Sequence, residues 1–512
     1  MEEFLQTETV IIELLLIVSL VAIAIQRIRL PYTVALVLVG LALTFQDVIR
    51  FELTEELILA LFLPPLLFEA AFHVEFKKLK EKLLPILVLA IPGVILGTFI
   101  VGGFVAFGTT LTWPTALVFG ALIAATDPVA VIAVFRATGA PKKLATLVEG
   151  ESLFNDGAAV VLFNIVLGVA LTGHFNAIDG LWEFVRVSAG GLAIGLGLGW
   201  VVAQLIARLD DYLIETTLTT LLAFGSFLIA EEFHMSGVLA VVAAGILNGN
   251  IGPKGMSPST KIVLFNFWEY LAFLANSLIF LLIGLEMELP VLFDNIGPII
   301  IATLGVLLAR VISVYGLSWL TGHFRGGQIP LKWQHILTWG GLRGAVSLAL
   351  ALGLPAALGP DRALIQAMAF GVVLIILLTQ ATTIEPLLKR LELVGRPEVE
   401  VAYDRSRGKL FALRTAHKHL ETMYRQGGLS EHAWQVLEPE MKAAGDQATG
   451  HLRQLVQTEA LLEEKEITTA RRELLITQRG ALYSLQHDGL IDSDVFAELA
   501  TEIDQQLDQL AD

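Results

Sequence analysis

Cysteine is absent from the 512-residue chain, which excludes disulfide bonds and any metal site with cysteine ligands. Charged residues are scarce, because Asp, Glu, Lys and Arg together make up only 16% of the sequence, against 55% hydrophobic residues. The first five residues, Met-Glu-Glu-Phe-Leu, lack the basic region and cleavage site of a signal peptide. We therefore expect the first apolar run to be a membrane anchor that the protein retains.

The charge that does occur is concentrated near the C-terminus. Residues 400–512 hold 20 acidic and 12 basic side chains, so the net charge of −16 describes mostly exposed segments and gives no reason to expect a nucleic-acid partner. The mean hydropathy of +0.70 is far above that of a soluble enzyme. These contrasts predict two domains, a transmembrane domain over residues 1–397 in the lipid bilayer and a polar tail over residues 398–512.

Apolar runs of suitable length predict an all-α membrane domain with about thirteen transmembrane helices. The expected spans are 9–26, 32–49, 55–73, 83–107, 114–135, 145–170, 182–207, 214–231, 236–250, 262–285, 290–320, 335–354 and 363–388. Alternate connections carry 17 basic residues, whereas the others carry three. Because basic residues favour the cytoplasmic side, we expect the N-terminus outside and the C-terminus in the cytoplasm.

The tail and one span show helical patterns of their own. Apolar residues recur at helical spacing in 409–425, 431–444, 450–484 and 494–510, which predicts a small helical cytoplasmic domain.

Gly191, Gly195 and Gly199 follow one another at four-residue intervals inside an apolar run. That spacing predicts close packing against a neighbouring helix.

Two expected spans are interrupted. In the fifth, Pro128 lacks a backbone donor and disfavours helical backbone at Asp127, and in the twelfth Gly340, Gly341 and Gly344 fall within five residues. Broken helices leave free amide and carbonyl groups in the membrane, which is tolerated only beside a polar cavity. Because these spans are seven apart, we expect inverted repeats around the seventh span and a binding site where the broken helices cross.

A polar stripe in the sixth span marks the expected pathway. Glu151, Ser152, Asn155 and Asp156 are spaced i, i+1, i+4 and i+5, which places them on one side of a helix. A lone carboxylate at membrane depth costs roughly 2.5–3.5 kcal/mol even on the mildest scale, so such residues usually face a water-filled path or another polar group. We interpret the stripe as part of the lining of an ion pathway.

Four blocks of sequence closely resemble the sodium/proton exchangers of the cation:proton antiporter-1 family, in particular the prokaryotic NhaP-like members. The blocks are 62–70 (Phe-Leu-Pro-Pro-Leu-Leu-Phe-Glu-Ala), 125–130 (Ala-Thr-Asp-Pro-Val-Ala), 149–157 (Glu-Gly-Glu-Ser-Leu-Phe-Asn-Asp-Gly) and 340–346 (Gly-Gly-Leu-Arg-Gly-Ala-Val). The resemblance covers roughly residues 10–390 and implies a multi-pass protein of the plasma membrane. It also implies a homodimer formed through the membrane domain, with a core domain that moves against a dimerisation domain.

The resemblance also assigns roles to individual residues. The aspartate that matches Asp156 exchanges a proton for a cation. Four other positions match residues that bind the ion or shape its site, namely Thr126, Asp127, Ser152 and Asn155. Glu151 and Arg343 match a carboxylate–arginine pair that holds the broken-helix regions together. No cofactor is implied, because the protein would be a transporter rather than an enzyme.

The chemistry of these residue types suits a monovalent cation. Sodium prefers oxygen ligands, which Asp156, Thr126, Ser152 and the carbonyl groups of residues 125–128 can supply. A carboxylate that binds either a proton or a cation must titrate near the working pH, and burial raises the pKa of carboxylates. Because Asn155 is neutral, one-for-one electroneutral exchange of Na⁺ or Li⁺ for H⁺ is the simplest expectation, although Asp127 adds a second carboxylate.

Alternatives remain open for several residues. Asp127 could cap the helix that follows it, and Thr126 and Ser152 could bond to carbonyl groups of their own helices. Glu69 and Arg310, which are also intramembrane, are expected to form structural ion pairs with each other or with other groups.

Other functions also remain open. A K⁺/H⁺ antiporter of the same family is the second candidate. An intramembrane protease and a passive cation channel are more distant, because no suggestive Ser–His pair and no continuous polar pore are evident.

Overall fold

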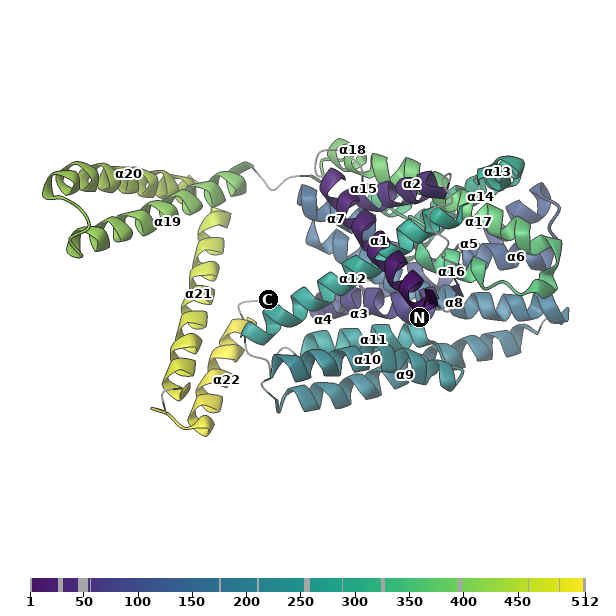
Figure 1. Cartoon of the computed structure of the whole chain (residues 1–512), viewed down its shortest axis with the longest axis horizontal. Coiled ribbons are helices and arrows are strands. Elements are labelled where there is room, and N and C mark those ends of the chain that lie inside the picture. The colour runs from purple at the N-terminus through teal and green to yellow at the C-terminus, as the bar shows by residue number, and fades with distance from the viewer. Residues whose placement is uncertain are drawn as a thin grey trace. The chain divides into compact units, whose positions relative to one another are not determined.

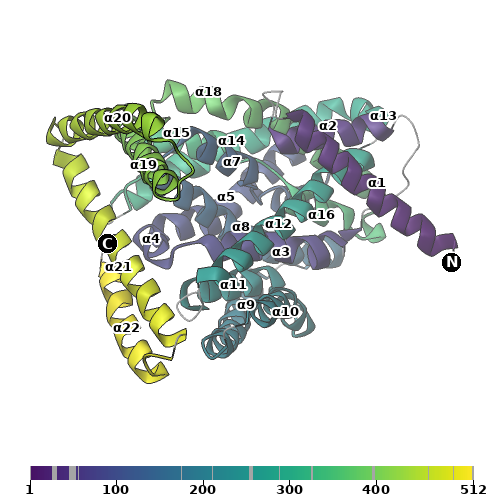
Figure 2. The ribbon, with the colours of Figure 1, turned by 60° about the vertical axis from the view of Figure 1, so that its left-hand side comes forward.

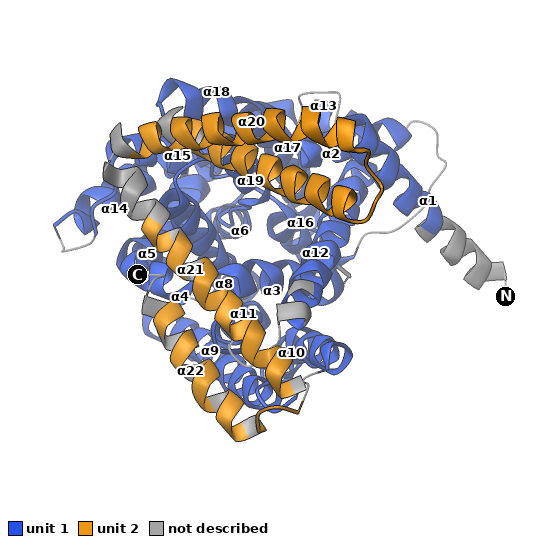
Figure 3. Ribbon diagram, turned by 90° about the vertical axis from the view of Figure 1, so that its left-hand side faces the viewer, with its two compact units in different colours: residues 1–394 blue, residues 395–512 orange. Residues whose placement is uncertain are grey.

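The computed structural model describes residues 2–25, 31–44, 54–55, 57–174, 176–209, 211–252, 258–287, 289–323, 327–394, 398–458, 460–487 and 489–509. Every regular element in these ranges is helical, which confirms the predicted all-α fold. The chain divides into two compact units, residues 1–394 and 395–512, which Figure 3 colours separately. The expected boundary after residue 397 adjoins residues 395–397, which lie outside the described ranges.

The first unit begins with the helices up to α8 (Figure 1). They are α1 (Glu2–Ile25), α2 (Tyr32–Thr44), η1 (Leu57–Phe62), α3 (Leu63–His73), α4 (Phe76–Glu81), α5 (Leu83–Gly108), α6 (Trp113–Leu122), α7 (Val129–Thr138) and α8 (Lys142–Thr172). The remainder of the unit consists of α9 (Ala177–Ile206), α10 (Tyr212–Glu232), α11 (Gly237–Ile251), α12 (Pro258–Glu286), α13 (Leu289–Asp294), α14 (Ile296–Thr321), α15 (Leu331–Trp339), α16 (Ala345–Leu352), η3 (Ala356–Leu358), α17 (Pro360–Ile376), η4 (Leu377–Ala381) and α18 (Thr382–Arg390).

Seven helical segments of this unit are long and apolar enough to cross a membrane by length and composition. They are Leu83–Gly108, Lys142–Thr172, Ala177–Ile206, Tyr212–Glu232, Val263–Glu286, Ile296–Thr321 and Pro360–Arg390. The other expected spans fall on shorter apolar helices or on the two interrupted helices, so the total of thirteen stays a prediction.

Both predicted interruptions are confirmed. α6 ends at Leu122 and α7 begins at Val129, while α15 ends at Trp339 and α16 begins at Ala345. Local sequence also sets the turn between α7 and α8, because Gly139 ends α7 with φ of 71° and Pro141 directly precedes α8. The short Gly139–Pro141 connection brings α8 back beside α7, so the polar stripe passes close to the interruption.

The helices of the first unit pack in two groups. The first helix group comprises α5, α6, α8, α14, α16 and α17, and the second comprises α2, α3, α9, α10, α11 and α12. Figures 1 and 2 show α9, α10 and α11 lying side by side within the second group.

The glycine pattern of α9 accounts for its close packing against α11. Gly191, Gly195 and Gly199 are buried against that helix, and a Cβ atom at Gly195 would lie 2.0 Å from the backbone oxygen of Ala240. Any larger residue would push the two helices apart. The predicted close helix packing is therefore confirmed.

The second unit contains α19 (Glu398–Arg425), α20 (Glu431–Thr458), α21 (Ala460–His487) and α22 (Ser493–Gln509). The helix break expected between residues 444 and 450 is wrong, because α20 continues through Gly445 and Gly450. A glycine inside a helix costs only about 1 kcal/mol relative to alanine. Packing between α19 and α20 offsets this cost, through a small core that comprises Tyr403, Leu410, Ala448 and Leu452.

Candidate ion-binding site

The two interrupted helices meet at their breaks. The backbone N–H of Asp127 donates a hydrogen bond of 2.8 Å to the carbonyl oxygen of Leu342, which joins segment 123–128 to segment 340–344. Pro128 and the nearby glycines prevent either segment from continuing as a helix, so this backbone pairing replaces helical hydrogen bonds that are lost. The breaks therefore create a polar surface inside the helix bundle, and α8 packs beside it.

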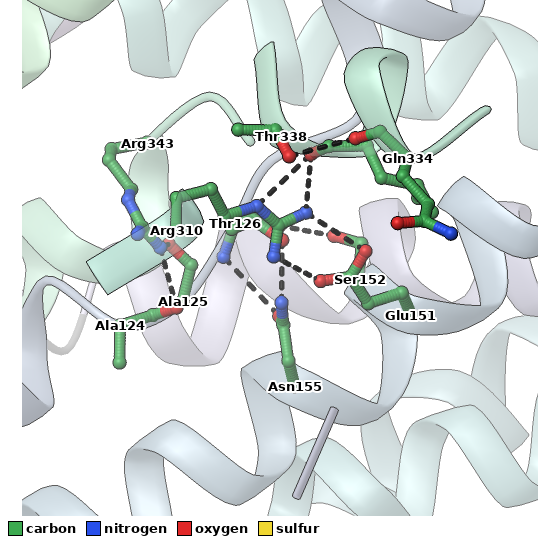
Figure 4. Close-up of polar contacts among 11 residues, drawn as sticks. Ala124, Ala125, Thr126, Glu151, Ser152, Asn155, Arg310, Gln334, Thr338 and Arg343 are labelled. Atoms are coloured by element: carbon green, nitrogen blue, oxygen red, sulfur yellow. Dashed lines mark hydrogen bonds and ion pairs between the residues drawn. The ribbon is translucent and has the colours of Figure 1, made fainter. Parts of the chain in front are cut away.

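Side chains of α8 hold the first break open. Asn155 Nδ2 donates to Thr126 Oγ1 at 2.5 Å, and Asn155 Oδ1 accepts from the backbone N–H of Thr126 at 3.3 Å. Ser152 Oγ donates to the carbonyl oxygen of Thr126 (Figure 4). Ser152 and Asn155 thus satisfy the backbone and side chain of Thr126 from another helix. The alternative that Thr126 and Ser152 bond only to their own helices is wrong in this structure.

Asp127 shows the bond expected of a helix cap. Its Oδ1 accepts from the backbone N–H of Val129, the first residue of α7, at 2.9 Å. A carboxylate is favoured there by the free N–H groups and the positive end of the helix dipole. The second oxygen, Oδ2, lies against Gly344, so Asp127 touches the other broken helix as well. The capping interpretation is confirmed, and ion binding by Asp127 stays a prediction.

Gly344→Ala is expected to destabilise the crossing of the broken helices. The added Cβ would lie 2.2 Å from Asp127 Oδ2 and 2.5 Å from Asp127 Cβ, so the backbone must shift. Overpacking of this kind typically costs about 1–3 kcal/mol. We expect lower thermal stability in detergent together with slower ion exchange. Gly316→Ala in α14 is the matched control, because nothing lies within 4 Å of its added Cβ; equal effects of both variants would contradict the contact.

Asp156 faces a small cavity beside this crossing. The cavity has a volume of about 80 Å³, and the Asp156 side chain that lines it is only 8% exposed. Within the described residues, no hydrogen bond or ion pair to the Asp156 carboxylate is found. The cavity is lined by Leu63, Leu66, Leu67, Ala70, Ala125, Thr126, Asp127, Pro128, Val129, Glu149, Ser152, Leu153, Asp156, Asn276, Gly344, Ala345, Val346 and Ser347. It thus brings together four of the five predicted ion-binding residues.

The polar stripe of α8 divides between two cavities. Ser152 and Asp156 line the first cavity, whereas Glu151 and Asn155 line a neighbouring one of about 20 Å³ that also contains Arg310 and Arg343. Helical geometry explains the division, because Ser152 and Asp156 are four residues apart, as are Glu151 and Asn155. One side of the stripe faces the candidate ion site, and the other faces two arginines.

The predicted pair between Glu151 and Arg343 is wrong in this structure. Glu151 instead forms a two-pronged ion pair with Arg310 of α14, in which Nη2 donates to Oε2 at 2.9 Å and Nη1 donates to Oε1 (Figure 4). Arg310 also donates through Nε and Nη2 to the carbonyl oxygen of Leu337 at 3.1 and 2.9 Å. That carbonyl belongs to the last turn of α15, where a cation is favoured. Arg310 thus connects α8 to the second broken helix.

Arg343 donates hydrogen bonds to backbone carbonyl groups at the first break and forms no ion pair with a carboxylate among the described residues. Its side chain is 4% exposed, and Nη1 donates to the carbonyl oxygens of Ala124 and Ala125 at 2.6 and 3.0 Å. These carbonyl groups follow the end of α6, where helical donors run out. Glu69, the other intramembrane acid, lies 3.2 Å from His73 of its own helix rather than near Arg310. The expected ion pair of Arg310 with another group is confirmed, whereas an ion pair of Glu69 stays a prediction.

Sequence reasoning missed three polar residues that line the first cavity, namely Glu149, Asn276 and Ser347. A signal was present for Glu149, because Glu149, Ser152 and Asp156 are spaced i, i+3 and i+7 and so share one helix face. Asn276 lies beside Ser277 within an apolar run, and Ser347 lies singly within another. Neutral polar residues at such positions are common in membrane helices and attract no attention by themselves.

Comparisons with known proteins identify the family of the chain. The family described as sodium/hydrogen exchanger, transmembrane, matches residues 14–390. The chain is 42% identical to the Na⁺/H⁺ antiporter ApNhaP of Aphanothece halophytica, covering 76% of this chain and 74% of that protein. It is 40% identical to the Na⁺/H⁺ antiporter NhaG of Bacillus atrophaeus, covering 93% and 92%.

A solved structure is similar as well. The sodium proton antiporter MjNhaP1 of Methanocaldococcus jannaschii superposes with a TM-score of 0.64 at 25% identity, covering 76% of this chain and 99% of that one. The match to the family extends over both broken helices, α8 and the ion pair that connects them. The chain therefore belongs to the sodium/hydrogen exchanger family, whose members are membrane transporters rather than enzymes.

Proposed function

We propose that this protein exchanges Na⁺ for H⁺ across the membrane and that the two ions compete for the carboxylate of Asp156. The observation that carries the proposal is the position of Asp156, which lines a small cavity and forms no hydrogen bond or ion pair with another described residue. A carboxylate in such a place must take up a proton or a cation to avoid a lone buried charge. The two relatives described above are named as Na⁺/H⁺ antiporters, which supports sodium as the cation.

Neighbouring groups favour cation binding at this place. Thr126 and Ser152, which carry hydroxyl oxygens, line the same cavity as Asp156. Oxygen ligands suit Na⁺ and Li⁺. The positive charge of Arg310 is balanced by Glu151 in the neighbouring cavity. Arg343 attracts the carboxylate of Asp156 electrostatically but forms no ion pair with it, because its guanidinium donates to the carbonyl oxygens of Ala124 and Ala125.

One-for-one exchange follows if Asp156 alone changes its charge. Loading one sodium ion or one proton then leaves the site with the same charge, so the cycle is electroneutral. The charge of Asp127 does not change during this cycle if its carboxylate stays hydrogen-bonded at the start of α7. We propose alternating access in a homodimer, with the N-terminus outside and the C-terminus in the cytoplasm, as the basic connections indicate.

Proteoliposomes test the function directly. Purified protein is reconstituted with an internal pH dye, and sodium, lithium or potassium chloride is added in turn. Sodium-driven proton movement without a membrane potential supports the proposal, whereas a response to potassium alone identifies a K⁺/H⁺ antiporter. Flux that requires no opposing ion would indicate a channel. Peptide cleavage without ion exchange would indicate a protease.

Competition at one carboxylate predicts how the apparent sodium constant changes with pH. Below the pKa of Asp156, each fall of one pH unit should raise the apparent sodium constant about tenfold, which equals ~1.4 kcal/mol of competition. Above that pKa, sodium affinity should level off while scarcity of protons slows turnover. The exchange rate plotted against pH should thus be bell-shaped. Its acid limb, the part of the curve where the rate falls as the pH falls, should move to lower pH as the sodium concentration rises. An acid limb that does not respond to sodium contradicts a shared site.

A further inference from the structure

The walls of the first cavity come from both helix groups. α8 and the two broken helices supply the side of the cavity that contains Asp156. The rest of the lining comes from α3 and α12 of the second group, through Leu63, Leu66, Leu67, Ala70 and Asn276. Among these described residues only Asn276 is polar. It is therefore the side chain through which the second group can attract an ion.

Asn276 is buried without a hydrogen-bonding partner in the described residues. Its side chain is 7% exposed, and no hydrogen bond from its amide to another described residue is found. The adjacent residue on α12 behaves differently, because Ser277 Oγ donates to the carbonyl oxygen of Phe273 at 2.6 Å and lies 2.9 Å from the hydroxyl oxygen of Tyr32. Buried amides without partners are costly and rare. An amide that opens into an ion cavity is explained if it binds the ion.

A second polar residue without a hydrogen-bonding partner belongs to the lining of the same cavity. Ser347 of α16 is fully buried, and its hydroxyl has no hydrogen-bonding partner in the described residues. A serine inside a helix usually donates to the carbonyl group four residues earlier. Ser347 and Asn276 lie on different helix groups, yet both line the cavity that Asp156 also lines. The cavity thus collects polar groups that nothing else in the described structure satisfies.

We propose that Asn276 contributes its amide oxygen to the transported cation from the second helix group, so that the bound cation connects the two groups. This inference rests on the proposed function of Asp156. An amide oxygen is a good ligand for a hard cation, but it does not bind a proton at physiological pH. Asn276 therefore strengthens the binding of sodium without strengthening the binding of its competitor. It is a specificity-determining residue rather than a proton carrier.

Replacing the amide tests this role. Asn276→Leu keeps a side chain of similar size and removes the oxygen, so the apparent sodium constant should rise about tenfold or more, as is typical when a charged group loses a polar partner. Because protons then compete more effectively, the acid limb at saturating sodium should move about one unit to higher pH. Asn276→Asp should lower the sodium constant at alkaline pH, a gain that misfolding cannot produce. Ser277→Ala is the matched control on the same helix and should leave the sodium constant unchanged.

The outcomes separate this inference from the proposed function. If Asn276→Leu retains the wild-type sodium constant and acid limb, Asn276 does not bind the ion and the inference is overturned. A loss of thermal stability with an unchanged sodium constant also overturns it, because it shows a purely structural role. Failure of the wild-type protein to exchange sodium for protons would instead remove the proposed function itself.

Discussion

Asp156→Asn is expected to abolish sodium-driven proton movement while leaving the protein folded and inserted in the membrane. Asparagine has nearly the same shape, but it can neither release a proton nor carry the negative charge that a cation requires. Because no described residue pairs with Asp156, its neutralisation breaks no contact on which folding depends. Stability should therefore be unchanged or higher, since a buried charge is removed. Proton flux in proteoliposomes and thermal unfolding in detergent measure the two effects.

The control for this experiment is Asp294→Asn, which neutralises an exposed carboxylate in the same unit. It should retain normal exchange, since it changes the net charge equally but lies outside the cavity. Measurable sodium-dependent proton movement by Asp156→Asn would show that another group carries the proton. Asp127 would then be the first residue to examine, because it lines the same cavity.

The parts of this site that were predictable from the sequence are those with local causes. Pro128 and the glycines at 340, 341 and 344 restrict the backbone wherever they occur, so the interruptions of both helices could be predicted without knowing their neighbours. Asp156 stood out because a charge within a long apolar run is costly in any fold. Helical periodicity alone predicts which polar residues of α8 share one face. How these residues divide between two cavities depends on the surrounding helices.

The pairing of charges was not predictable from the sequence in the same way. Glu151 can reach an arginine from either α14 or the break before α16, and both arginines lie more than 150 residues away in the sequence. The choice depends on how α14 packs beside α8, which no local pattern specifies. Gly341 illustrates this, because an added Cβ there would lie 2.5 Å from Arg310 Nε. A glycine predicted only to break a helix also makes room for the arginine that binds Glu151.

Breaking the Glu151–Arg310 pair by removing one partner is expected to destabilise the site strongly. Glu151→Gln leaves the guanidinium of Arg310 without its charged partner, at a place where the side chain is 12% exposed. Removing one partner of a buried ion pair typically costs about 3–5 kcal/mol. The free positive charge also lies in the cavity next to Asp156, so sodium affinity should fall as well. Thermal unfolding and sodium titration of the purified variant measure both effects.

A double-mutant cycle distinguishes this pair from the one that the sequence suggested. Arg310→Gln should be about as destabilising as Glu151→Gln, and the double variant should be much less unstable than the sum, because the second change removes the charge that the first left alone. The corresponding cycle between Glu151 and Arg343 should show weaker coupling, since Arg343 binds the carbonyl groups of Ala124 and Ala125 instead. Strong coupling of Glu151 to Arg343 with none to Arg310 would reverse the assignment. In that case Arg343, rather than Arg310, would connect α8 to the second broken helix.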